Sequence, residues 1–168
     1  MCPIERMTQV FISHYSGDVD KARSVMEAIN ALPDFHAVLI VERREPLKAL
    51  AQEVSEGIID SKYFVPLLTP KSRETQWVNQ EIGFAVSRGK KVYPLVDKEV
   101  LHGLKGFITK EYDLPYVYRE HADPDNQMTF ESARKRIVED LVAEERGVLL
   151  GVAKARLKVI VNQGFDAV

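Results

Sequence analysis

Trp77 and Glu81 lie four residues apart, in a segment that follows a predicted buried strand and its loop. In a helix this spacing puts both side chains on one face, one turn apart. Open α/β sheets bind their ligands at the carboxyl ends of parallel strands, which is where this segment would begin. The indole and the carboxylate therefore form a candidate active site.

A single carboxylate suits one particular kind of bond cleavage. Most glycosidases use two carboxylates, because a poor leaving group must be protonated while the sugar carbon is attacked. A nicotinamide ring on a ribose departs as a neutral molecule without an acid, so Glu81 alone could stabilise or trap the cationic sugar. Trp77 and Tyr15 offer flat surfaces on which a ring can stack. The ordinary alternative is a solvated glutamate beside a core tryptophan.

The surrounding pattern predicts the elements that would position this pair. Apolar runs of strand length alternate with segments of helical periodicity, which indicates a parallel sheet covered by helices on both faces, a doubly wound α/β sandwich of five strands. Pro66 and Pro94 fall inside two predicted strands, so we expect strand ends or bulges there. The predicted strands are Gln9–Ser13, His36–Val41, Tyr63–Thr69, Lys91–Val96 and Leu114–Tyr118, and the predicted helices are 18–32, 47–58, 77–88 and 130–141.

The 168 residues predict one domain, with residues 1–146 as its body. Residues 147–168 are expected to be a C-terminal extension of the same domain or a partner-binding tail. A net charge of −2 gives no global field that would attract nucleic acid or an anionic membrane. The single cysteine, Cys2, excludes an internal disulfide, and the first residues lack the apolar stretch of a secretion signal. We therefore expect a cytoplasmic protein.

Several chemistries common in α/β sheets lack their residues here. The segment after the first strand, Ser13 to Gly17, has one glycine, where a dinucleotide fingerprint needs several, and no phosphate-binding loop with its lysine follows. The third predicted strand ends in Thr69 and Pro70, where a phospho-acceptor domain would need an aspartate. The four histidines are scattered without partners at ligand spacing, so we expect no metal site and no bound cofactor.

Four blocks of the sequence together resemble a TIR domain. They are Val10–His14, Ile58–Ser61, Ser72–Ile82 with its W-x-x-x-E pattern, and Gly89–Leu95, in the order and spacing of that family. The resemblance implies a flavodoxin-like fold. In the NAD-consuming branches of the family it makes Glu81 the catalytic residue and NAD⁺ the substrate.

The resemblance also implies roles for other residues. It places Trp77 beside the substrate and makes Ser13, His14 and Tyr15 the loop that borders the pocket. The segment that includes Glu42 and Arg43 corresponds to a loop that shapes the site and mediates contacts between domains.

Three functions remain open. The first is an NAD⁺ glycohydrolase or ADP-ribosyl cyclase that acts in anti-phage signalling, as in stand-alone Thoeris-like TIR proteins, with a downstream effector that senses a cyclic product. The second is a non-catalytic module that signals by TIR–TIR self-association. The third is a nucleoside N-glycosidase or deoxyribosyltransferase-like enzyme, which also uses a glutamate on a similar sheet.

Overall fold

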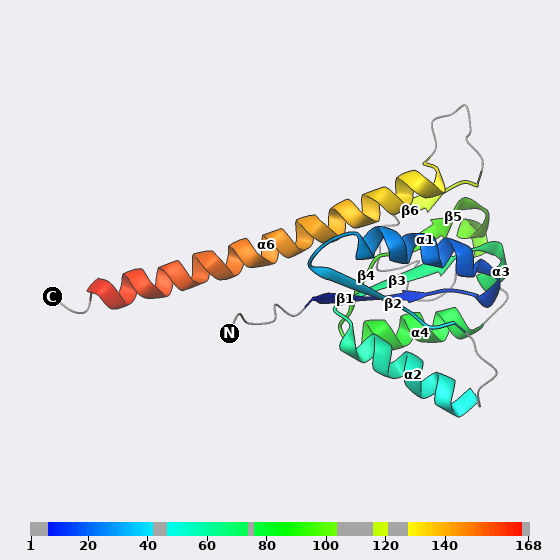
Figure 1. The fold of residues 1–168 in the computed structure, drawn as a ribbon, viewed down its shortest axis with the longest axis horizontal. Helices are drawn as coiled ribbons and strands as arrows, with labels where there is room; N and C mark the ends of the chain where they lie inside the picture. Colours follow the sequence, from blue (N-terminus) through cyan, green and yellow to red (C-terminus); the bar gives the residue numbers. More distant parts are fainter. Residues whose placement is uncertain (1–6, 42–46, 74–75, 104–115, 121–127, 166–168) are drawn as a thin grey trace.

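The computed structural model describes residues 7–41, 47–73, 76–103, 116–120 and 128–165. Its centre is a parallel sheet in the order β2-β1-β3-β5-β6, with β4 also paired to β3 (Figure 1). This order is the flavodoxin-like one, so the predicted fold class is confirmed. The strands are β1 (Thr8–Ser13), β2 (Phe35–Leu39), β3 (Tyr63–Leu68), β4 (Lys91–Val92), β5 (Leu95–Asp97) and β6 (Tyr116–Tyr118).

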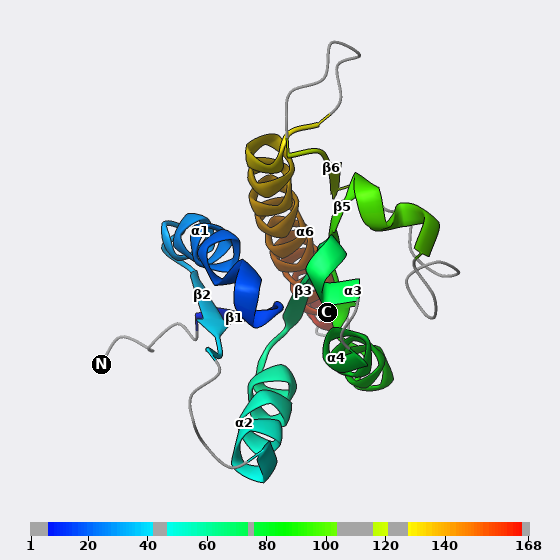
Figure 2. The same cartoon turned by 90° about the vertical axis from the view of Figure 1, so that its right-hand side faces the viewer.

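Helices cover both faces of the sheet (Figure 2). Successive side chains of a strand point to opposite faces, and β1 follows this rule: Val10 and Ile12 pack beneath α1 and α6, whereas Phe11 packs beneath α2 and α4. The two cores fix which residues at the strand ends face α4. The α-helices are α1 (Val19–Asn30), α2 (Leu47–Asp60), α3 (Pro70–Arg73), α4 (Gln76–Ser87) and α6 (Phe130–Phe165), with 3₁₀ segments η1 (Ser16–Asp18) and η2 (Lys98–Gly103).

The sheet has six strands where the sequence predicted five, because the segment Lys91–Val96 is divided at Tyr93 and Pro94. The partner strand β3 pairs with β4 through Phe64 and with β5 from Leu67, and Pro66 lies between these two ladders. Neither proline has an N–H to donate, so the pairing of β3 with β4 and β5 is interrupted where they occur, while the pairing of β3 with β1 continues through Pro66. The expected irregularity is present at Pro94, whereas Pro66 lies inside a continuous strand.

Helix α2 lies close to β1 because Gly57 has no side chain. A Cβ at Gly57 would lie 2.6 Å from Cε2 of Phe11. The Phe11 ring is itself stacked on Phe64, with ring centroids 6.0 Å apart. This contact fixes how closely α2 packs against the sheet. Leu50 and Val54 of α2 pack in the same core cluster as Phe11.

Helix α6 runs on well past the sheet (Figure 1). Its first part packs on the core through Ala133, Ile137 and Leu141. Farther along, its exposed large apolar side chains include Val148, Leu149, Leu150 and Val152. Residues 147–165 thus continue one helix without a break, and their role as extension or partner-binding tail stays a prediction. In the described ranges no helix combines the length and apolarity that crossing a membrane requires.

We expect Gly57→Ala to lower the free energy of unfolding by about 1–3 kcal/mol, because the added methyl group collides with a ring that cannot move away. The matched control is Gly151→Ala in α6, where nothing lies within 4 Å of the added Cβ. Helix propensity alone should raise stability there by up to about 1 kcal/mol. Urea unfolding of both variants measures the difference. Equal effects of the two substitutions would show that α2 does not depend on this close approach.

Candidate active site

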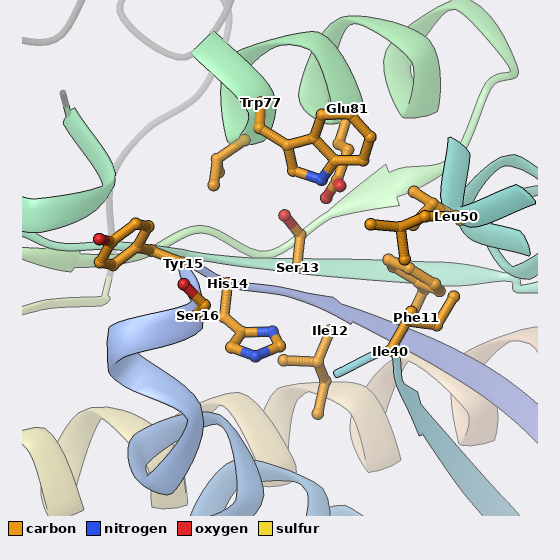
Figure 3. A pocket seen from close by; sticks show the side chains of 12 residues that line it. Phe11, Ile12, Ser13, His14, Tyr15, Ser16, Ile40, Leu50, Trp77 and Glu81 are labelled. Carbon is orange, nitrogen blue, oxygen red and sulfur yellow. The ribbon is translucent and has the colours of Figure 1, made fainter. Parts of the chain in front are cut away.

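A pocket of about 90 Å³ lies where the carboxyl end of β1 meets the start of α4 (Figure 3). A buried water needs roughly 10–15 Å³ of such space, so this pocket has room for a small ring and not for a whole dinucleotide. The polar groups of Ser13, Trp77 and Glu81 gather at it. Its apolar walls are Phe11, Ile12, Ile40, Leu50, Val54 and Val78.

Glu81 is the buried charge of the pocket. It sits on α4 beside Val78 and Ile82, which anchor the helix on the sheet, and only 8% of it is exposed. Burial is the main cause that raises the pKa of Glu81 to about 7, and interactions with Ser13 and Trp77 offset part of that rise. The Glu81 carboxyl therefore titrates closer to neutral pH than an ordinary glutamate does. A group with such a pKa, in a pocket, is a candidate for chemistry.

Ser13 is the last residue of β1 and shares the face of Phe11, so its side chain points toward Glu81 (Figure 3). Its hydroxyl is buried, and at ordinary hydrogen-bond length it has no partner within the described ranges. The interaction with Glu81 that lowers the pKa of the carboxyl is consequently a longer one. A hydroxyl left in this state costs stability unless a ligand or water satisfies it.

Trp77 covers the carboxylate. It begins the face of α4 that continues with Glu81 one turn later, and Figure 3 shows its indole above the carboxylate. Among the residues that the structure describes, the pocket lining includes no lysine or arginine. Within those residues, Glu81 thus lies beside a flat ring and no cationic side chain. A ligand with positive charge and a planar ring suits this arrangement.

The other predicted site residues do not gather around the Glu81 carboxylate. His14 and Tyr15 line the pocket, but the His14 ring lies on the opposite side of β1 from Glu81 (Figure 3), as strand alternation dictates. Tyr15 packs over Gly17, where a Cβ would lie 2.8 Å from its Cε1. Glu42 and Arg43, also predicted to bind substrate, lie outside the described residues.

Sequence reasoning missed the contribution of α2. Leu50 and Val54 were recognisable as the apolar side of a helix, and Ile40 as part of an apolar run, but nothing marked them as pocket walls. The only available signal was topological: α2 leads into β3, the neighbour of β1, and so passes over Phe11. For metals, the described ranges hold no group of three or more His, Cys, Asp or Glu that could bind an ion.

Comparisons with known proteins agree with the fold. A family model described as TIR domain matches residues 10–128. Eighteen chains of solved structures match, among them the CMP N-glycosidase BcmB of Clostridium botulinum, with a TM-score of 0.53 and 11% sequence identity. That match covers 82% of this chain and 99% of the glycosidase, and at this identity it shows the fold alone. No curated protein matches the sequence.

The raised pKa of Glu81 predicts how stability depends on pH. Between the ordinary pKa of 4.5 and the folded value of about 7, the folded chain holds the proton more tightly than the unfolded chain. The free energy of unfolding therefore loses this contribution as pH rises through that window. The free energy of unfolding of Glu81→Gln, relative to that of the unsubstituted protein, should therefore increase by up to about 3 kcal/mol as pH rises through this window. Above the window the difference should stay constant.

Urea unfolding at a series of pH values measures this difference. The control is Glu53→Gln, which changes an exposed carboxylate on α2 and should show no such growth. If the curves of Glu81→Gln and the unsubstituted protein stay parallel from acid to neutral pH, Glu81 is not a buried carboxyl in solution.

Proposed function

Because this chain belongs to the TIR domain family, we propose that it cleaves the nicotinamide–ribose bond of NAD⁺ and forms ADP-ribose or a cyclic isomer. The observation that carries the proposal is the buried Glu81 carboxylate, which faces a small pocket with no lysine or arginine among its described lining residues. NAD⁺ brings a positive charge and a flat ring, which are the two properties that the pocket suits.

In the proposed reaction the nicotinamide ring enters the pocket and stacks on Trp77, which brings the anomeric carbon beside Glu81. The C–N bond breaks and its electron pair leaves with the ring nitrogen, so nicotinamide departs neutral. The ionised carboxylate stabilises the positive charge that develops on the ribose, or traps it as an ester. Water then adds to give ADP-ribose with loss of a proton, or a nucleophile of the same substrate closes a ring.

Ser13 has a supporting role in this proposal. Its buried hydroxyl has no hydrogen-bond partner among the described residues and points toward the carboxylate. It is free to donate to Glu81 in its charged form or to a polar group of the substrate. Either bond would satisfy a hydroxyl that has no partner among the described residues.

The biological setting is a further part of the proposal. Family membership supports self-association through TIR–TIR contacts. A place in anti-phage signalling, a cyclic product and an effector that senses it follow only from the resemblance to stand-alone TIR proteins. The non-catalytic alternative predicts no nicotinamide release even from concentrated protein.

A second candidate reaction comes from the structural neighbour, whose name says that it acts on CMP. Cleaving the base from a nucleotide whose pyrimidine ring is uncharged calls for a proton donor, because the leaving base is otherwise anionic. A carboxyl with a pKa of about 7 could serve as that donor. CMP therefore belongs beside NAD⁺ in the same assay.

Glu81→Gln should lower the rate of nicotinamide release by about 10²-fold or more, because the amide keeps the shape of the side chain and loses its charge. Chromatography of NAD⁺ digests measures the rate. The control Glu53→Gln changes an exposed glutamate of α2 and should retain full activity. Unchanged turnover in Glu81→Gln would remove Glu81 from the reaction, and thermal unfolding of the variant checks that the fold persists.

The pH profile should show which protonation state acts. If the carboxylate acts, kcat/KM for NAD⁺ rises with pH around about 7 and then levels off. The corresponding rise in kcat should occur at lower pH, because the bound pyridinium cation lowers the pKa of Glu81. Rates from about pH 5 to pH 9 test this. A profile that falls through neutrality would instead indicate that Glu81 donates a proton, as the CMP reaction needs.

A further inference from the structure

A second hollow lies on another side of Glu81. It has a volume of about 280 Å³ and runs between α2 and α4, with Ser55 and Ile58 on one wall and Gln80 and Phe84 on the other. Trp77, Glu81 and Val54 line both this groove and the pocket beside Ser13. The two spaces therefore meet at the same carboxylate.

One face of α4 supplies the wall of this groove. Trp77, Gln80, Glu81 and Phe84 follow one another at spacings of three and four residues, so an indole, an amide, a carboxylate and a phenyl ring lie along one stripe. Seven residues separate the two aromatic side chains, which is about 10 Å along the helix axis. The stripe offers one flat surface on each side of Glu81.

The charge of the groove restricts its occupant. Among the described residues its lining includes no lysine or arginine, and Glu81 contributes negative charge when ionised. This charge disfavours a phosphate group inside the groove and does not oppose a neutral ring, so the groove suits the ring of a nucleotide and not its phosphates. The other described lining residues are apolar, apart from the Gln80 amide and the Ser55 hydroxyl.

The polar groups that remain match the edge of a purine. A glutamine amide donates and accepts side by side, which is the pattern that pairs with N7 and the N6 amino group of adenine. The Ser55 hydroxyl donates to the Ala51 carbonyl at 2.8 Å and keeps its lone pairs as acceptors. The Arg88 guanidinium lies 5.0 Å from the centre of the Phe84 ring and helps to hold that ring in place.

We propose that the groove between α2 and α4 binds the adenine ring of the substrate, while the pocket beside Ser13 takes the nicotinamide ring. This inference rests on the proposed function and deepens it. The pocket alone is too small for a dinucleotide, and ligand sites usually measure roughly 300–1,000 Å³, so a site that spans both hollows reaches an ordinary size. The two rings then lie on either side of Glu81.

Two substrates that share the scissile bond test the assignment. NAD⁺ carries the adenosine half, and nicotinamide mononucleotide lacks it. Ser55→Phe fills the groove and should lower kcat/KM for NAD⁺ about tenfold or more, while it leaves nicotinamide mononucleotide within about twofold of the unsubstituted enzyme. Gln80→Ala removes only the amide and should lower kcat/KM for NAD⁺ about two- to tenfold, the range of a single hydrogen bond.

The matched control is Glu53→Phe, which adds the same ring at an exposed position of α2, two residues away and so on the far side of the helix. This variant should leave kcat/KM unchanged for both substrates. Thermal unfolding shows whether each variant keeps its fold.

The outcomes separate the two proposals. Selective loss with NAD⁺ supports the adenine site. Equal loss with both substrates, or no loss with either, overturns it and leaves NAD⁺ cleavage standing. If the unsubstituted protein cleaves neither substrate even when concentrated, the proposed function itself fails, and the adenine site fails with it.

Discussion

The burial of one carboxylate is the constraint on which the candidate site depends. Glu81 is held beneath the Trp77 indole because its neighbours on α4, Val78 and Ile82, are drawn into the core beneath the sheet. A helix that packs through these residues must also turn Glu81 inward. Holding a carboxylate away from water costs stability, and Glu81 faces a pocket with no lysine or arginine among its described lining residues. Carboxyl groups with strongly perturbed pKa values cluster at functional sites.

The periodicity of apolar residues and the alternation of side chains along strands predict much of this architecture, because both are local properties of the chain. The alternation of apolar runs predicted the parallel sheet and the order of helices around it. The parity of β1 follows from the same rule: once Phe11 faces α2 and α4, Ser13 must face them too, and the His14 ring must turn away. The resemblance placed Ser13 and His14 together in a loop that borders the pocket, and both line it. Their opposite orientations follow from strand alternation alone, and their roles in substrate binding stay predictions.

Other features depend on contacts that no local pattern encodes. The single predicted strand Lys91–Val96 divides because Pro66 of the neighbouring strand and Pro94 both fall at the same place in the ladder. The short helix α3 was not predicted, since its four residues are too few for a periodic pattern. The burial of Glu81 was equally beyond reach of the sequence: one glutamate among 25 acidic residues acquires a raised pKa only through the helix and sheet that enclose it.

A positively charged ligand would reverse the energetic effect of burying Glu81. Burial raises the pKa of Glu81 to about 7 and so disfavours its ionised form, and the Ser13 hydroxyl has no partner among the described residues. A cationic ring would favour the ionised carboxylate, and a polar substituent on it could satisfy the hydroxyl. Binding would then be coupled to release of the Glu81 proton, since the two positive charges compete for one carboxylate. The same burial that lowers the stability of the protein without ligand therefore strengthens its preference for a substrate that carries positive charge. That preference follows from the position of Glu81 on a helix that is held against the sheet by the apolar neighbours Val78 and Ile82.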